Sequence, residues 1–88
     1  MKELPRSEEA EKELLGQIIS DPKCIEEIRD LIPSPNIFYI TAHQILWKTI
    51  SDMYERKEEI GFVTVIDNIP KKYKDILSAY YITGLIEG

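Results

Sequence analysis

The apolar positions at the start of the chain repeat with the period of an α-helix. Between Glu8 and Ser20 they fall on one helical face, which consists of Ala10, Leu14, Leu15, Ile18 and Ile19. Ser7 is placed to cap this helix with its hydroxyl, and the acidic residue at position 8 puts negative charge at the positive end of the helix dipole. The pattern predicts a first helix over residues 8–20.

A second helical period follows Asp21-Pro22, where Asp suits an N-cap and Pro suits a first helical position that needs no N–H donor. The period continues up to Pro33 through Ile25, Ile28, Leu31 and Ile32. Cys24 lies in this segment. Because no basic cluster adjoins it in sequence, we expect a small buried apolar residue rather than a reactive thiol.

The segment Ser34–Ile40 begins with Ser-Pro, which is typical of a short turn or one turn of 3₁₀ helix. Its side chains Ile37, Phe38 and Tyr39 are too apolar for a free loop, so we expect them to fill the core. Thr41 is placed to cap the next helix.

The longest helix is predicted over residues 42–57. Its apolar stripe consists of Ala42, Ile45, Leu46, Thr49, Ile50, Met53 and Tyr54. The opposite face is polar and holds Lys48, Asp52, Glu55 and Arg56. Asp52 and Arg56 are four residues apart and could form a surface pair.

The segment Phe62–Ile69 is rich in β-branched residues, which favours a strand, yet no convincing second strand exists to accept its hydrogen bonds. We therefore interpret it as a short helix that ends at Pro70. A last helix is predicted over residues 73–86, weakened at Gly84. The sequence thus predicts one all-α domain over residues 1–88, an orthogonal, irregular bundle of about five helices. Its ordered core spans about residues 7–86, after a flexible lead-in of seven residues.

Composition narrows the class of function. The chain has 88 residues and a net charge of −5, and its one basic cluster is Lys71, Lys72 and Lys74. Direct nucleic-acid binding is not expected, because such proteins need a basic face to neutralise phosphates. No apolar run could span a bilayer, and the acidic N-terminus does not fit a signal peptide, so we expect a cytoplasmic protein.

No pattern of residues points to catalysis. The four glycines are isolated from one another, so no glycine-rich phosphate loop exists. One Cys and one His cannot form a four-ligand zinc site. The single histidine, His43, has no neighbouring acid in sequence, and we expect it to make a structural contact at a helix surface or boundary. Three adjacent acidic pairs, Glu8-Glu9, Glu26-Glu27 and Glu58-Glu59, are interpreted as solvated faces. We predict no catalytic, cofactor-binding or metal-binding residue.

Aromatic side chains are the remaining candidates for a functional site. Trp47 lies just outside the stripe of the longest helix, and Tyr80 and Tyr81 are adjacent, so both cannot face one interior. Core or boundary packing would account for each of them. The alternative is that at least one of the three contacts a partner protein, because aromatic anchors dominate such interfaces.

Four short segments occur in a distinctive order: LPRSEEAEKELLG (Leu4–Gly16), SPNIFY (Ser34–Tyr39), AHQILW (Ala42–Trp47) and IGFVTV (Ile60–Val65). Together they resemble the N-terminal domain of DnaB-type replicative helicases over nearly the whole chain. The first matches the family's Leu-Pro, Glu-Ala-Glu and Leu-Gly elements. The second matches Ser-Pro and Phe-Tyr, and the third matches Ala-His before an aliphatic-aromatic run. Two departures are Gly61, where the family usually has Asp, and Leu77-Ser78, near the family's Gly-Gly.

The resemblance implies an all-α head that packs into the N-terminal collar of a hexameric ring and helps to dock primase or a helicase loader. It also implies that Val63–Val65 is helical. The family's helical hairpin and ATPase domain are not present in these 88 residues. We therefore expect either an excised domain of an ATP-dependent helicase or a short natural relative.

Three other functions are weighed against this one. A primase's C-terminal helicase-binding domain has a related fold, but it would normally follow a catalytic domain, whereas the motif LPRSEEAEKELLG begins just after Met1. A stand-alone regulator that binds helicase is also compatible with the pattern. A helix-turn-helix DNA binder is disfavoured by the acidic charge.

Overall fold

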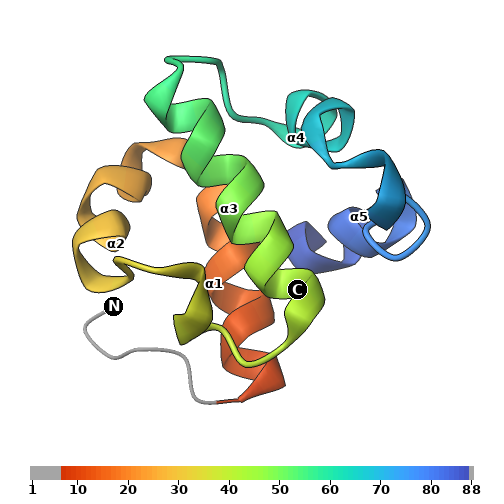
Figure 1. Cartoon of the computed structure of the whole chain (residues 1–88), viewed down its shortest axis with the longest axis horizontal. Coiled ribbons are helices and arrows are strands. Elements are labelled where there is room, and N and C mark those ends of the chain that lie inside the picture. Colours follow the sequence, from red (N-terminus) through yellow and green to blue (C-terminus); the bar gives the residue numbers. More distant parts are fainter. Residues whose placement is uncertain (1–6, 88) are drawn as a thin grey trace.

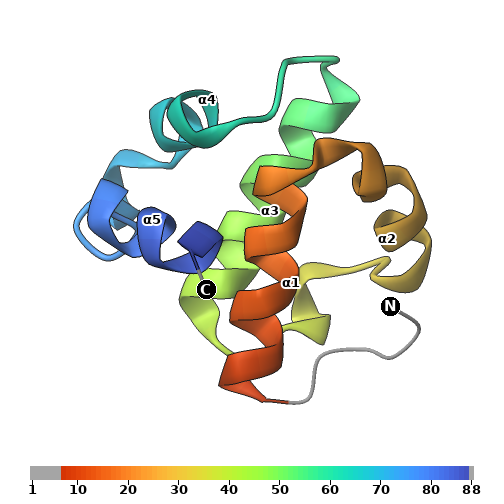
Figure 2. The ribbon, with the colours of Figure 1, turned by 180° about the vertical axis from the view of Figure 1, so that it is seen from behind.

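Helices α1 (Glu8–Ser20) and α3 (Thr41–Glu55) cross the middle of the computed structural model, which describes residues 7–87 (Figure 1). Helix α2 (Ile25–Leu31) covers one side of this pair, and α4 (Phe62–Asn68) and α5 (Ala79–Glu87) cover the other. Figure 2 shows the same arrangement from behind, with α1 in front of α3. Three 3₁₀ turns join the helices: η1 (Pro22–Cys24), η2 (Pro35–Ile37) and η3 (Lys71–Tyr73). Residues 7–87 contain no strand, which confirms the all-α prediction.

Helix α1 has the predicted limits, and α4 is one residue shorter than the predicted segment. Helix α1 begins after Ser7, whose Oγ accepts a hydrogen bond from the backbone N–H of Ala10 at 3.1 Å. Helix α4 confirms the interpretation of the β-branched segment, and it ends before Pro70. Gly61 is its N-cap, and its N–H donates to the hydroxyl of Thr64 at 2.9 Å. The lead-in predicted for the first seven residues lies outside the described residues, apart from Ser7.

The predicted caps of two other helices are wrong. Asp21 precedes the turn η1, with Pro22 at its start, but the Asp21 side chain makes no capping hydrogen bond. Thr41 is itself the first residue of α3, so Ile40 is the N-cap and offers no polar side chain.

The segment before α3 fills the core only in part. Phe38 is fully buried, as predicted, and Ile37 packs against the core. Tyr39 is 91% exposed, so its predicted place in the core is wrong. Cys24 is half-buried in η1 rather than in a regular helix.

The last helix is shorter than predicted, because residues 73–78 form turns and a 3₁₀ segment instead of its first turns. Ser78 precedes α5, and its hydroxyl accepts a hydrogen bond from the backbone N–H of Tyr81 at 3.2 Å. Helix α5 then continues through Gly84 without a break.

The C-terminal end of α3 has a backbone arrangement that the sequence did not predict. Lys57 adopts a left-handed conformation with φ of 61°, and the N–H of Glu58 donates to the carbonyl of Met53 at 2.9 Å. This is the Schellman arrangement, which closes a helix with a residue in the left-handed region. The predicted pair of Asp52 with Arg56 is not formed. Asp52 binds Lys48, and the Arg56 side chain binds Glu58 and Asn68 instead.

One buried cluster joins all five helices. It consists of Leu14, Leu15, Ile18, Ile19, Ile25, Ile28, Ile32, Phe38, Leu46, Trp47, Ile50, Met53, Ile60, Val65, Ile69, Leu77, Ile82 and Leu85. The apolar stripes predicted for α1 and α3 supply its centre. Within residues 7–87, no helix is both long and apolar enough to cross a membrane.

Helices α1 and α5 approach each other closely at Gly16. A Cβ atom on Gly16 would lie 2.0 Å from the carbonyl oxygen of Leu85, well inside van der Waals contact. Only glycine therefore permits this crossing of α5 over α1. Gly84, which precedes Leu85 on α5, has no neighbouring atom within 4 Å of an equivalent Cβ.

Candidate interaction surfaces

A buried carboxylate from α1 binds the backbone immediately before α3. The side chain of Glu11 is fully buried, and it accepts hydrogen bonds from the backbone N–H groups of Tyr39 at 2.6 Å and Ile40 at 3.3 Å. These groups lie at the entry to α3, where the helix dipole favours negative charge. Glu11 thus fixes the entry to α3 from another helix, whereas a capping side chain at Thr41 would have bound N–H groups further into the helix.

His43 extends this contact to α5. Its Nδ1 lies 2.7 Å from Oε1 of Glu11, and its Nε2 lies 2.6 Å from the hydroxyl oxygen of Tyr81. With Nδ1–H donating to the carboxylate, the lone pair of Nε2 in a neutral imidazole accepts the Tyr81 O–H. The three side chains therefore join α1, α3 and α5 through one polar network inside the core.

The Glu11–His43–Tyr81 network is structural in character. A carboxylate beside a histidine is also the arrangement that orients a catalytic base, but a base must reach the group from which it takes a proton. Glu11 and His43 are both 0% exposed, so no substrate can contact either side chain. His43 has the structural role that its sequence context indicated. Its predicted position at a helix surface or boundary is wrong.

Glu11 is the residue that sequence reasoning missed. It is separated from His43 by 32 residues, and spacing along the chain gives no sign that they meet. The available signal was the family resemblance, because Glu11 ends the Glu-Ala-Glu element and His43 ends the Ala-His element. The structure brings these two elements into direct contact.

The adjacent tyrosines of α5 have different environments, as predicted. Tyr80 is 90% exposed, whereas Tyr81 is half-buried with its hydroxyl on His43. Burial raises the pKa of Tyr81 above its usual value of 10.0, and the nearby carboxylates of Glu8 and Glu11 act in the same direction. The ammonium group of Lys12 opposes this rise.

A shallow cavity of about 290 Å³ lies beside these tyrosines. We call its lining the α5 face, which consists of Lys12, Tyr80, Tyr81, Thr83, Gly84, Leu85 and Glu87. The exposed ring of Tyr80 lies at this face, next to a neighbour that is held in place by a hydrogen bond.

Trp47 is placed differently from the two tyrosines. Its side chain is 2% exposed, and its ring centroid lies 6.0 Å from that of Phe38, with a tilt of 44° between the rings. So little exposed surface leaves Trp47 poorly placed to anchor a partner. It contributes instead to the floor of a second cavity.

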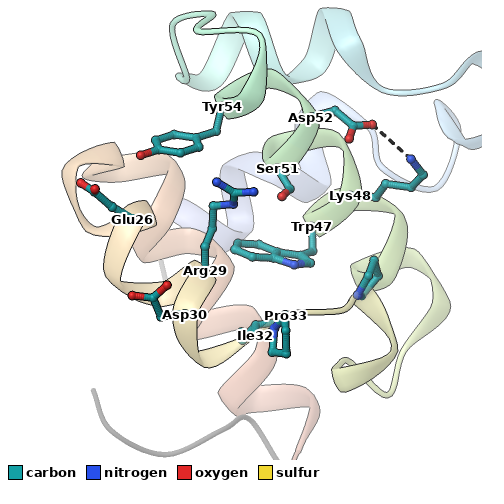
Figure 3. Close-up of a pocket in the computed structure, with 11 residues that line it drawn as sticks. Glu26, Arg29, Asp30, Ile32, Pro33, Trp47, Lys48, Ser51, Asp52 and Tyr54 are labelled. Carbon is teal, nitrogen blue, oxygen red and sulfur yellow. Dashed lines mark hydrogen bonds and ion pairs between the residues drawn. The ribbon is translucent and has the colours of Figure 1, made fainter.

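This second cavity is a groove of about 620 Å³ between α2 and α3 (Figure 3). We call it the α2–α3 groove. Its lining residues are Glu26, Arg29, Asp30, Ile32, Pro33, Pro35, Trp47, Lys48, Ser51, Asp52 and Tyr54. Figure 3 shows the Arg29 side chain extending across the groove from α2, with the rings of Tyr54 and Trp47 on either side of it.

The described residues form no candidate metal site. Residues 7–87 contain no group of three or more His, Cys, Asp or Glu side chains that could hold a metal ion. The pKa of the Cys24 thiol is raised, first by burial and then by the charge of Asp21. A raised pKa lowers the fraction of reactive thiolate.

Comparison with known proteins agrees with the resemblance seen in the sequence. The family model of the DnaB-like helicase N-terminal domain matches residues 3–88. No curated protein sequence matches the chain. The matched region corresponds to the N-terminal domain of these helicases, which is distinct from their ATPase part.

Proposed function

Because the chain belongs to the DnaB-like helicase N-terminal domain family, we propose that it is a non-catalytic interaction domain that serves a replicative DNA helicase. In this proposal it helps to organise the helicase ring through contacts with other helicase subunits, and it docks primase or a helicase loader during replication in the cytoplasm. The domain itself performs no reaction.

The exposed ring of Tyr80 is the observation that supports a docking role most directly. A tyrosine that is 90% exposed on a helix presents a large, stiff side chain with both an apolar body and a hydroxyl. Such residues are enriched among the anchors of protein interfaces. Two contacts described above, Gly16 with Leu85 and His43 with Tyr81, fix α5 on the core. The α5 face is therefore presented rigidly, which reduces the entropy lost on binding.

The charge of the chain supports a protein partner over a nucleic acid. The net charge is −5, and the basic cluster of Lys71, Lys72 and Lys74 is exposed at the connection before α5. One of its three ammonium groups, that of Lys74, already donates to the carbonyl of Ile66 at 2.9 Å. Two remaining lysines do not make a phosphate-binding track of the kind that duplex DNA requires.

The test compares two exposed tyrosines. Tyr80→Ala should weaken binding of the purified primase or loader from the same organism by about tenfold or more, as expected for an interface anchor. Tyr39→Ala is the matched control, since Tyr39 is equally exposed but is not part of the α5 face. Calorimetric titration gives the affinities, and circular dichroism checks that both variants fold.

Equal affinities for the wild type and Tyr80→Ala would remove the α5 face from the proposal. Sedimentation of the chain with and without the other helicase subunits tests the organising role separately. A chain that binds neither primase, nor loader, nor helicase subunits would contradict the proposed function as a whole.

A further inference from the structure

The cations of the α2–α3 groove are already paired within the chain. Arg29 forms an ion pair with Glu55, and its guanidinium carbon lies 4.9 Å from the ring centroid of Tyr54. The ammonium of Lys48 lies 3.2 Å from a carboxylate oxygen of Asp52. Neither basic side chain is therefore left to attract an anionic partner.

Two carboxylates of the same groove are unpaired. Glu26 and Asp30 line the groove from α2, and both are exposed. Among residues 7–87, neither has an ion pair or a hydrogen bond through its side chain. Because they are four residues apart on one helix, they share a face, and Figure 3 shows them both on the α2 side of the groove. Arg29 and Lys48 are neutralised by their ion pairs with Glu55 and Asp52, so the groove keeps the two negative charges of Glu26 and Asp30.

Apolar residues line the bottom of the groove, and Pro33 and Pro35 supply most of their exposed surface, because Ile32 and Trp47 are each 2% exposed. Ile32, Pro33 and Pro35 line it where the chain leaves α2, and Trp47 lines it from α3. The proline rings restrict the backbone, and Trp47 is held by its packing against Phe38. The exposed surface of the proline rings can contact an apolar side chain without rearranging, and the groove has a volume of about 620 Å³.

We propose that the α2–α3 groove binds a peptide segment of a partner protein in which an apolar anchor is flanked by Arg or Lys. The anchor would lie on the floor, and the basic side chains would face Glu26 and Asp30. Charge complementarity selects this occupant, because an acidic segment would meet two unpaired carboxylates and no free cation. The inference goes beyond the proposed function, since it concerns α2 and α3 and does not depend on the α5 face.

The experiment uses the full chain and a random library of twelve-residue peptides as the probe. Selection should enrich peptides with an aliphatic or aromatic residue next to Arg or Lys. A peptide selected in this way is then titrated into ¹⁵N-labelled protein. Trp47 is the only tryptophan of the chain, so its indole N–H gives a single signal that reports on the floor of the groove. We expect this signal to shift, and we expect binding to weaken as salt is added.

Two double variants separate this groove from general attraction to an acidic protein. Glu26→Gln with Asp30→Asn should lower the affinity for the selected peptide about fivefold, as expected for two exposed charge contacts. Asp67→Asn with Asp75→Asn removes the same charge from exposed positions outside the groove and should leave the affinity within twofold. Equal losses in the two variants would overturn the proposal.

Three other results would also overturn it: selection of acidic peptides, selection of no peptide, or shifts at the α5 face with none at Trp47. The Tyr80→Ala comparison described above does not involve the groove. If the peptide experiment gives a negative result, the proposed function is unaffected. If Tyr80→Ala binds as the wild type does, the proposal for the α2–α3 groove is unaffected.

Discussion

Oε1 of Glu11 lies 2.7 Å from Nδ1 of His43, and both side chains are completely enclosed by the core. A charged or polar group in such a position destabilises a fold unless all of its hydrogen-bonding atoms are satisfied. Here they are: in the described part of the chain, every buried side-chain nitrogen and oxygen has a partner. The pair thus makes the packing of α1 against α3 specific in a way that apolar contacts alone would not.

Glu11→Ala should be among the most destabilising single changes in this chain. It removes the acceptor of two partly buried backbone N–H groups and of the His43 ring, and leaves the Nδ1 of His43 buried without a partner. We expect a loss of about 3 kcal/mol in the free energy of unfolding, measured by urea denaturation. Glu13→Ala, at an exposed position of the same helix, is the control and should change stability by less than about 0.5 kcal/mol. Similar effects of both changes would contradict the role given to Glu11.

Two glycine-to-alanine substitutions should have opposite effects. Gly16→Ala places a methyl group against the Leu85 carbonyl and forces α5 away from α1, which should cost about 2 kcal/mol or more. Gly84→Ala adds a methyl group where there is open space and restricts the unfolded chain, so it should stabilise the domain by about 0.5–1 kcal/mol. Thermal unfolding of both variants, followed by circular dichroism, measures the difference. A stable Gly16→Ala variant would mean that the helices do not approach as described.

Lys57 offers a site for stabilisation. Its φ of 61° is unfavourable for any residue with a Cβ atom, by about 1 kcal/mol relative to glycine. Lys57→Gly should therefore raise the free energy of unfolding by about that amount, measured by urea denaturation. Lys57→Ala removes the same charge and retains the Cβ atom, so it should give no such gain. Equal stability of the two variants would contradict the left-handed conformation.

The raised pKa of Tyr81 makes a prediction about alkaline pH. The folded protein holds the phenolic proton more tightly than the unfolded chain, in which tyrosine has a pKa of about 10. By linkage, this contribution to stability is complete below pH 10 and is lost as the pH rises through the higher pKa of the folded state. In an alkaline titration of the folded protein followed by tyrosinate absorbance, the Tyr81 phenol should accordingly ionise above pH 10.

Tyr81→Phe is the control for this titration. The variant lacks the phenol with the raised pKa but keeps the packing of the ring. It should therefore lose less stability at alkaline pH than the wild type does. Because the variant also leaves Nε2 of His43 without its hydroxyl donor, we expect it to be less stable than the wild type at neutral pH by about 1 kcal/mol. An unchanged alkaline titration would show that another tyrosine accounts for it.

Local patterns located most of the helices, because periodicity and end signals act within a few residues. The apolar stripe of α1 and its cap at Ser7 were both predicted, and so was the helical nature of α4. The first residue of α5 was predicted wrongly, and the reason is also local. Tyr73, Ile76 and Leu77 continue a helical period, but the Ser78 hydroxyl binds the N–H of Tyr81 and begins the helix there.

Interactions between distant residues could not be predicted in this way. The backbone at the entry to α3 is held by Glu11 from another helix, and Thr41 is not the cap. The burial of Trp47 depends on Phe38, whose position in space follows from the turn η2. The α2–α3 groove likewise depends on how two helices pack, and no spacing along the chain indicates it.

The order in which the chain is synthesised gives the contact of His43 with Tyr81 a further consequence. The two residues are 38 positions apart, and Tyr81 lies in α5, the last helix of the described residues. Helices α1 and α3 therefore emerge from the ribosome before Tyr81, the residue that donates to Nε2 of His43. Until α5 emerges, the nascent chain carries an incomplete core with a polar atom that only water can satisfy, and completion of this fold waits for α5 to leave the ribosome.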